Sequence, residues 1–359
     1  MKSINKNYLL SALIILSTAI HFYGRNALSV EKNYSNGFFV SFSELLRSGT
    51  GKLPFSIGDL LYGILFFVII AQGCLFLYKI INRKLQDFSI VGLIKKLLIT
   101  CLSIYVIFNI FWGLNYNRKG IASQTNLSLD QYNHVDLNNI NKLLVEKANH
   151  TKSILVNNKR EYPDDEHLFT GTINAYHKAN TISPFLNYSN PSIKKSLWGW
   201  LGNYWGFTGY YNPFTGEAQI NTTVPKFQLP FVCCHEVAHQ LGYAKENEAN
   251  FVAFLVAHSS GDTLFLYSAY LDLFLYANRS LYGVDSASAK QYRELLSDAV
   301  KNDIQELITF NKSHRNIMEP LISNIYDFFL RSNQQPQGMM SYDQVTGYII
   351  AYYKKNGDI

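Results

Sequence analysis

Residues 235–250 read His235-Glu236-Val237-Ala238-His239-Gln240-Leu241-Gly242-Tyr243-Ala244-Lys245-Glu246-Asn247-Glu248-Ala249-Asn250, and this segment is the most informative in the chain. Residues four apart lie one turn apart on the same face of a helix, so His235 and His239 can bind one metal ion together. Glu236 lies beside them, where it can take a proton from a water molecule. This H-E-x-x-H spacing is typical of zinc hydrolases.

A helical projection of this motif separates an apolar side from a reactive side. The apolar side comprises Cys234, Val237, Ala238 and Leu241. Both histidines fall on the flank, with Glu236 further round the helix. A structural pair of histidines would not need that glutamate, so the pattern favours a metal site. Gly242 is predicted to end the helix, because a glycine often follows the last apolar residue of a helix.

A second helix is predicted from Glu246 through His258. Glu246 heads a stripe that continues through Asn250 and two alanines, whose small side chains allow another helix to approach closely. We therefore predict Glu246 as the third metal ligand, with Glu248, which points to nearly the opposite side, as the alternative. Both glutamates would also suit the first turn of any helix, where the helix dipole favours negative charge. Asn250 is predicted to hold a ligand histidine through the other ring nitrogen.

Two imidazoles and one carboxylate leave a fourth position for water on Zn²⁺, although such ligands also suit other divalent metals. Zinc lowers the pKa of that water to about 7. We expect Glu236 to accept the proton of the water and pass it to a leaving amine, so that a peptide or protein is the expected substrate. A donor for the developing oxyanion is also needed. The candidates are Tyr243, His258, Tyr267 and Tyr342.

A short polar segment before the motif helix is predicted to be an edge strand. It reads Gly216-Glu217-Ala218-Gln219-Ile220-Asn221. An edge strand can hold an extended substrate by strand addition, which makes this segment the candidate substrate strand. A plain core strand explains the same residues equally well. Residues 197–222 are rich in tryptophan, tyrosine and glycine and are predicted to form short strands and turns. The aromatic side chains at 198–211 are predicted to serve packing rather than to line a substrate pocket.

The N-terminal third contains three apolar segments, at residues 8–22, 58–81 and 97–113. The second is long enough to span a bilayer, and the third is slightly short but carries no charge. The first follows Lys2 and Lys6 and could by itself be a signal peptide. Because two spans follow it, we interpret it as an uncleaved anchor. The sequence thus predicts three transmembrane helices over residues 1–113 and a globular domain over 114–359.

Cationic residues near the spans predict how the chain is oriented. Lys2 and Lys6 precede the first span, and five cations crowd the short connection between the second and third spans: Lys79, Arg83, Lys84, Lys95 and Lys96. The positive-inside rule then puts the N-terminus and this connection in the cytoplasm. Residues 114–359 would lie on the outer, periplasmic face of a bacterial cytoplasmic membrane. Arg118 and Lys119 argue weakly for the opposite orientation.

The composition supports membrane attachment and excludes some partners. Hydrophobic residues make up 48% of the chain and charged residues 16%, which differs from ordinary soluble enzymes. The net charge of +6 comes without a long basic run, so we expect a lipid bilayer and no nucleic acid as a partner. Four cysteines do not predict a disulfide framework. Cys233 and Cys234 are predicted to be buried and not to bind zinc, because a C-x-x-C spacing is absent.

Apart from the small sheet, residues 114–359 are predicted to be mainly helical, an α+β arrangement. Helical periodicity covers residues 137–156 before the motif and 263–279, 291–311, 316–331 and 342–354 after it. The segment 263–279 is apolar enough to raise the question of a fourth span. It is short and contains Asp272, so a buried core helix is the better interpretation.

Two resemblances to known families support the prediction of a zinc site. Glu246-x-x-Ala249-Asn250 after H-E-x-x-H resembles the gluzincin arrangement of zinc peptidases. The chain as a whole resembles an uncharacterised family of bacterial membrane proteins with a predicted metallopeptidase domain, on the blocks 115–116, 209–217, 229–250 and 341–345. The resemblance implies a zincin-like fold with the same ligands. One departure stands out: the interval from His239 to Glu246 is short for a gluzincin, and Gly242 lies where metzincins have their turn glycine. Lys245 occupies the place of a metzincin's third histidine, which counts against that class.

The leading hypothesis from the sequence is therefore a membrane-anchored zinc metallopeptidase. Because the ligand interval is short, the alternative is a domain that binds zinc but is inactive, and serves as a sensor or scaffold of the cell envelope. A third possibility is an intramembrane protease. It ranks last, because Leu229 to Tyr243 is too short and too polar to be a spanning helix.

Overall fold

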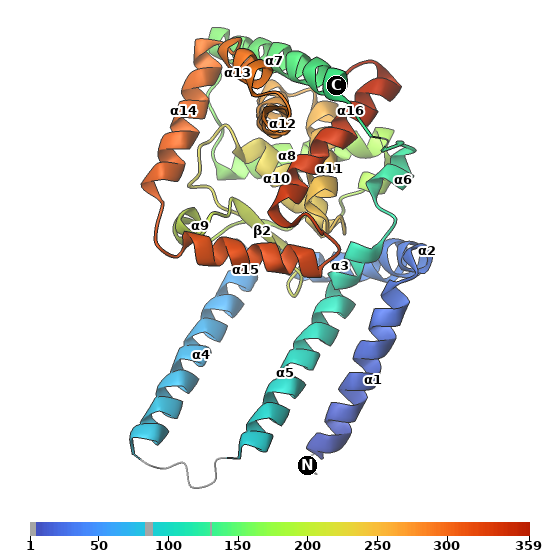
Figure 1. Cartoon of the computed structure of the whole chain (residues 1–359), viewed down its shortest axis with the longest axis vertical. Helices are drawn as coiled ribbons and strands as arrows, with labels where there is room; N and C mark the ends of the chain where they lie inside the picture. Colours follow the sequence, from blue (N-terminus) through green and yellow to red (C-terminus); the bar gives the residue numbers. More distant parts are fainter. Residues whose placement is uncertain (1–4, 83–88, 130) are drawn as a thin grey trace.

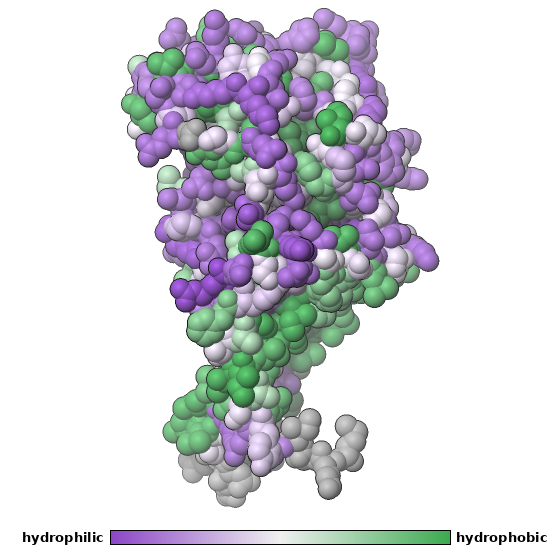
Figure 2. Space-filling view, turned by 90° about the vertical axis from the view of Figure 1, so that its right-hand side faces the viewer, coloured by the Kyte–Doolittle hydropathy of each residue, from purple (hydrophilic) through white to green (hydrophobic). Residues whose placement is uncertain are grey.

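The computed structural model describes residues 5–82, 89–129 and 131–359. Three long apolar helices extend from one end of a globular domain (Figure 1): α1 (Lys6–Gly24), α4 (Ile57–Ile81) and α5 (Ile90–Phe111). Each is long and apolar enough to cross a membrane, and almost none of their residues are buried within the protein. Between Asp59 and Lys79, α4 carries no charge. The three predicted spans are thus present as helices, and hydrophobic residues cover them in the space-filling view (Figure 2).

The third span begins earlier in the sequence than predicted, at residue 90 rather than at residue 97. Helix α5 begins at Ile90, where the hydroxyl of Ser89 accepts a hydrogen bond from the backbone N–H of Gly92. It therefore includes Lys95 and Lys96, whose long side chains can reach the membrane surface from the first two turns of a helix. The N-terminal ends of α1 and α5 and the C-terminal end of α4 all lie away from the domain (Figure 1). Lys2, Arg83 and Lys84 lie outside the described residues.

The segment between the first two spans belongs structurally to the domain. It forms α2 (Ala27–Ser29), the π-helix η1 (Val30–Phe38) and α3 (Phe39–Thr50). The guanidinium of Arg47, which is buried, donates hydrogen bonds to the backbone carbonyls of Ser189 (3.3 Å) and Gln240 (3.2 Å). The segment between the first two spans therefore supplies buried polar contacts to residues 114–359.

A buried carboxylate joins the domain to the second span. Oxygen atoms of Glu217 accept hydrogen bonds from the backbone N–H groups of Ile57 (3.0 Å) and Gly58 (2.6 Å), and from the hydroxyl of Thr215 (2.8 Å). These amides open α4, where the helix dipole favours a negative charge. Asp59 of the same turn accepts from the backbone N–H of Leu197 (2.6 Å) and from the hydroxyl of Tyr210. The span thus starts on a polar cluster inside the protein.

The sheet has three strands in the order β1-β3-β2, namely β1 (Ile193–Lys195), β3 (Glu217–Ile220) and β2 (Gly209–Asn212). Strand β3 pairs with β1 in parallel and with β2 antiparallel. All four residues of β3 are buried. The prediction of an edge strand over 216–221 is therefore wrong, since both edges of β3 already carry a partner. Residues 199–205, expected as strand or turn, form the helix α9 (Gly199–Trp205).

The helices of the domain surround α10 (Leu229–Gln240) and α11 (Glu246–Ser260). The core includes side chains of α7 (His134–Asn157), α8 (Asp165–Ile182), α12 (Thr263–Tyr282) and α16 (Val345–Asn356). Helix α12 is buried in this core and is not among the three candidate spans of the described residues, as the sequence predicted. The segment predicted as one helix over 291–311 is divided into α13 (Ser286–Glu294) and α14 (Asp298–Ser313).

The remaining elements are short or lie at the base of the domain. They are η2 (Gly113–Asn117), α6 (Ile121–Thr125), η3 (Pro184–Leu186), α15 (Glu319–Ser332) and η4 (Gly338–Gln344). A second apolar cluster joins the spans to the domain. It contains side chains of α1, η1, α3, α5, η2 and β2, together with Ala244 of the turn between α10 and α11.

Replacing Glu217 by alanine is expected to destabilise the protein by ~3–5 kcal/mol, because several buried donors lose their acceptor. Thermal unfolding in detergent, followed by circular dichroism, measures the effect. Glu294→Ala is the control, since that side chain is 83% exposed and should change stability by less than about 0.5 kcal/mol. Equal unfolding temperatures for the two variants would contradict the capping role of Glu217.

Candidate metal centre

The motif helix α10 is fastened to the sheet through Gln240. Its side-chain amide donates hydrogen bonds to the backbone carbonyls of Ser192 (2.9 Å) and Gly216 (2.7 Å), and its carbonyl oxygen accepts from the hydroxyl of Tyr188 (2.6 Å). The hydroxyl of Tyr176 donates to the backbone carbonyl of Cys234 (2.6 Å). All residues of α10 are buried. These contacts fix the rotation of the helix, and hence the direction of both histidines.

A tight turn at Gly242 brings α11 back beside α10. Gly242 has a φ of +84°, a conformation that favours glycine. A Cβ atom there would lie 3.0 Å from Oδ1 of Asn115 and 3.0 Å from the ring of Phe39. The backbone carbonyl of Gly242 accepts a hydrogen bond from Arg118 (3.2 Å), which forms an ion pair with Glu31 of η1. The turn ends α10 as predicted and places the first residue of α11 opposite the histidines.

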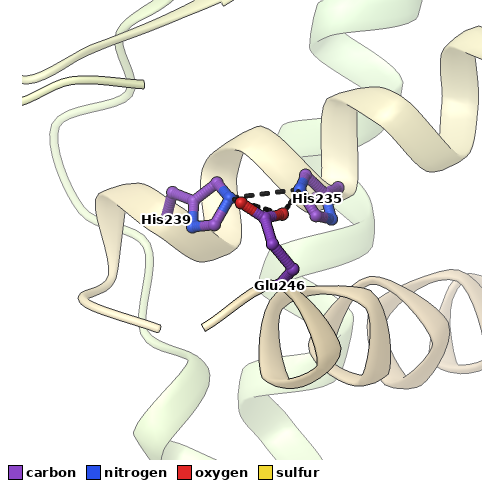
Figure 3. A group of neighbouring side chains, drawn as sticks. All are labelled: His235, His239 and Glu246. Carbon is purple, nitrogen blue, oxygen red and sulfur yellow. Dashed lines mark hydrogen bonds and ion pairs between the residues drawn. The ribbon is translucent and has the colours of Figure 1, made fainter. Parts of the chain in front are cut away.

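His235, His239 and Glu246 come together as the sequence predicted (Figure 3). The Nε2 atoms of the two histidines lie 3.1 Å apart. Oε2 of Glu246 lies 3.2 Å from Nε2 of His235 and 3.6 Å from Nε2 of His239. All three residues are buried. Three ligand atoms from two helices therefore converge on one point inside the protein.

The hydrogen bonding of His239 fixes which ring nitrogen carries a proton in the neutral imidazole. Its Nδ1 lies 2.7 Å from the backbone carbonyl of Tyr243, an acceptor, so Nδ1 must carry the hydrogen. In the neutral ring Nε2 then presents a lone pair to the carboxylate of Glu246 and to the other imidazole. Oε2 of Glu246 has no hydrogen-bond donor of good geometry. A neutral His239 would thus face the buried carboxylate as a second acceptor, an arrangement that a proton on Nε2 or a metal ion would relieve.

The pKa values of His239 and Glu246 show how these buried groups affect one another. Burial alone lowers the pKa of His239, but the facing carboxylate of Glu246 outweighs it and raises that pKa to about 9. Burial likewise raises the pKa of Glu246, and the two imidazoles reverse the effect and hold it well below its usual range. The pocket thus stabilises a positive charge on or between these groups.

The spacing of the three atoms fits a zinc ion. Nitrogen and oxygen ligands lie about 2.0–2.2 Å from zinc, so two ligands at a tetrahedral angle are separated by about 3.3–3.6 Å. The distances of 3.1, 3.2 and 3.6 Å lie within or close to this range. Three protein ligands also leave one position open. The residues present therefore fit zinc, with His235, His239 and Glu246 as the groups that would hold it.

Glu236 lies against the edge of the sheet. A Cβ atom on Gly209, the first residue of β2, would lie 2.7 Å from Oε1 of Glu236, so only glycine fits beside this carboxylate. Oε2 of Glu236 is buried without a hydrogen-bond partner. Burial raises the pKa of Glu236 to about 7, although the two histidines oppose the shift. A carboxylate with such a pKa can both accept and release a proton near neutral pH.

Two tyrosines complete the surroundings of Glu246, and only one of them was predicted. The hydroxyl of Tyr326, on α15, donates to Oε1 of Glu246 (2.9 Å) and lies 3.0 Å from the hydroxyl of Tyr342. The ring of Tyr342 is nearly parallel to that of His235, with centroids 6.4 Å apart. Burial raises the pKa of both tyrosines, so both hydroxyls keep their protons. Helical periodicity places Tyr326 on a helix, but no local pattern points it at Glu246.

The other predicted residues lie elsewhere. Glu248 is directed to Lys245 (3.4 Å) and to Gly120, away from the histidines. Among the described residues no hydrogen bond joins Asn250 to either histidine, and both its Nδ2 and Nδ1 of His235 are buried without a partner. Three candidate oxyanion donors are engaged outside the centre: Tyr243 donates to Gln124, Tyr267 donates to Asp303, and His258 packs its ring against Phe254. The sequence placed these residues on helices without fixing their direction.

Trp112 brings the end of the third span to the centre, a contact that the sequence did not predict. Its indole N–H donates to the backbone carbonyl of His239 (3.2 Å), and its ring meets the His239 ring edge-on at 5.9 Å. Trp112 directly follows the last residue of α5. The centre therefore lies next to the boundary between the spans and the domain.

A family model described as a protein of unknown function (DUF3810) matches residues 34–350. The chain belongs to this family. The match begins within η1, so it includes the segment between the first two spans as well as the metal centre. No curated protein and no solved structure matches the DUF3810 chain.

Replacing Gly242 by alanine should cost more stability than the same change at Gly261. Both glycines have positive φ, which costs an alanine ~1–2 kcal/mol, but nothing lies within 4 Å of the Cβ position at Gly261. At Gly242 the contacts with Asn115 and Phe39 are expected to add ~1 kcal/mol or more. Thermal unfolding of the two variants side by side measures the difference. Equal losses would show that space at the turn is not limiting.

Proposed function

We propose that this DUF3810 protein is a membrane-anchored zinc metallopeptidase with a zincin-like domain. The convergence of His235, His239 and Glu246 around one point, with Glu236 on the same helix, is the observation that supports the proposal most strongly. The spans support attachment to a membrane. Helix α10 is not one of the candidate spans among the described residues, which favours a domain beside the bilayer over an intramembrane protease.

Zinc bound by these residues would supply Lewis acidity, lowering the pKa of a water molecule to about 7. Glu236 would orient that water, accept its proton on the carboxylate and deliver the proton to the leaving amine. Tyr326 keeps one oxygen of Glu246 engaged, so that the other remains directed at the histidines. Tyr342 is the predicted oxyanion donor whose ring lies beside His235.

Because β3 lies in the centre of the sheet, we propose β2 instead as the strand that would bind substrate. Strand β2 lies at one edge of the three-stranded sheet and begins with Gly209, which is in contact range of Glu236. An extended peptide added to this edge would pass beside the general base. The aromatic side chains of β2 point to other partners, with Tyr210 bonded to Asp59 and the Tyr211 ring packed on Trp112.

The orientation in the membrane is part of the proposal. Lys6 begins α1, Lys79 lies in the last turn of α4, and Lys95 and Lys96 lie near the start of α5, all toward the ends of the spans that face away from the domain. The positive-inside rule favours the cytoplasm for those ends. The domain would then act at the outer, periplasmic face of a bacterial cytoplasmic membrane.

The purified full-length protein should contain about one zinc ion per chain, as expected for a three-ligand site. Glu246→Gln should lose that zinc on dialysis against a chelator that leaves the wild type loaded, because the carboxylate charge is removed. Glu248→Gln is the matched control, since it makes the same change two residues away and should keep its metal. Metal content by mass spectrometry distinguishes the two. A wild type without metal would overturn the proposal.

Glu236→Gln should keep zinc but lower peptide hydrolysis by at least ~100-fold, because the amide cannot accept the proton. Cleavage of a fluorogenic peptide library by the zinc-loaded protein measures this. Unchanged hydrolysis in the variant would contradict the role of Glu236. A zinc-loaded wild type that cleaves no member of the library would instead favour the inactive sensor or scaffold.

A further inference from the structure

Helix α15 has two faces of opposite character. At 100° per residue, Ile322, Tyr326 and Leu330 share the side that faces the domain, where Tyr326 reaches Glu246 and Leu330 is fully buried. A second side of the helix, centred about 130° from the first, carries large apolar side chains that no described part of the protein covers. These are Leu321, Ile325 and Phe328, which are 50%, 61% and 73% exposed. We call these three residues the α15 stripe.

The position of α15 in the molecule indicates what contacts the α15 stripe. The helix runs across the base of the domain, at the level where the spans leave it (Figure 1). Near its C-terminal end, the ring of Phe329 meets the ring of Phe108, in the last turn of α5, at 6.1 Å. The stripe therefore belongs to the same end of the domain as the membrane helices.

The N-terminal end of α15 is linked through α9 to a second span, α4. The side-chain amide of Asn316, just before α15, donates to the backbone carbonyl of Tyr204 (2.6 Å). Trp198, just before α9, donates its indole N–H to the backbone carbonyl of Asp59 in the first turn of α4 (3.0 Å). Helix α15 thus bridges the domain-side ends of two spans that are long enough to cross a membrane.

Helix α9 carries the residue types that gather at membrane interfaces. Its exposed aromatic side chains are Trp200, Tyr204 and Trp205. Tryptophan and tyrosine are enriched at the level of the lipid headgroups, where one part of the ring is apolar and another can bond to water. An amphipathic helix with leucine and phenylalanine on one face lies in the same layer.

From this arrangement we propose that α15 lies in the membrane interface, with the α15 stripe buried among the lipids of the bilayer that the three spans cross. The bilayer is thus the occupant of the apolar face. Another face of the same helix presents Tyr326 to Glu246, so the lipid surface supports one wall of the candidate metal centre. This inference goes beyond the peptidase proposal and does not require that the protein cleave peptides.

Lipid-borne quenching of a fluorescent label tests the proposal. The full-length chain carries Cys74→Ala and Cys101→Ala, while Cys233 and Cys234 stay because they are fully buried. Phe328→Cys and, separately, Ile325→Cys receive an environment-sensitive fluorophore. Each protein is placed, one chain per disc, in phosphatidylcholine nanodiscs with or without spin-labelled lipid. The control label is at Glu294→Cys, an exposed position at the opposite end of the domain.

We expect spin-labelled lipid to quench both stripe positions by at least about two-fold and to leave the Glu294→Cys control unchanged, because only the stripe labels lie among acyl chains. Two independent and largely exposed positions guard against a local defect at one of them. Water-like emission without quenching at both positions would overturn the proposal. Emission typical of an apolar environment without lipid quenching would also overturn it, and would show that the stripe is covered by protein.

Discussion

A buried carboxylate that faces two imidazoles is the interaction at the centre of the domain. Such an arrangement is costly, by several kcal/mol, unless a positive charge balances the carboxylate, either a proton on an imidazole or a metal ion. The three groups stay together because α10 and α11 are held independently of them. Gln240 fastens one helix to the sheet, and the turn at Gly242, bound by Arg118, returns the other. The helices therefore impose the cluster, and the cluster favours a positive charge.

The second constraint is the boundary between the spans and the domain. Polar groups at the start of a membrane helix must find partners before the chain enters lipid. Here the backbone N–H groups that begin α4 donate hydrogen bonds to Glu217 of the central strand. At the end of α5, the indole of Trp112 donates a hydrogen bond to the backbone carbonyl of His239. The anchor and the centre are thus parts of one folded unit, and the same strand that supports the motif helix also starts a span.

Residues near one another in the sequence were predicted well. The helices of residues 137–156 and 263–279, the end of the motif helix at Gly242 and the start of the next at Glu246 all follow from periodicity and capping. Long-range relations were not predicted. A short buried strand such as β3 has the same local pattern whether it lies at an edge or in the centre of a sheet. The loop between two spans gives no sign that Arg47 will be buried against the domain or that Glu31 will pair with Arg118.

Helical spacing and apolar length in the sequence were enough to predict three helices long and apolar enough to span a membrane, the shared face of His235 and His239, and the preference for Glu246 over Glu248. The side chains that complete the centre became visible only in the folded protein. Tyr326 lies 80 residues from Glu246 and Trp112 lies 127 residues from His239. Local patterns report on neighbours within a few turns, whereas contacts over such separations depend on how whole helices pack, and that is decided by the complete core.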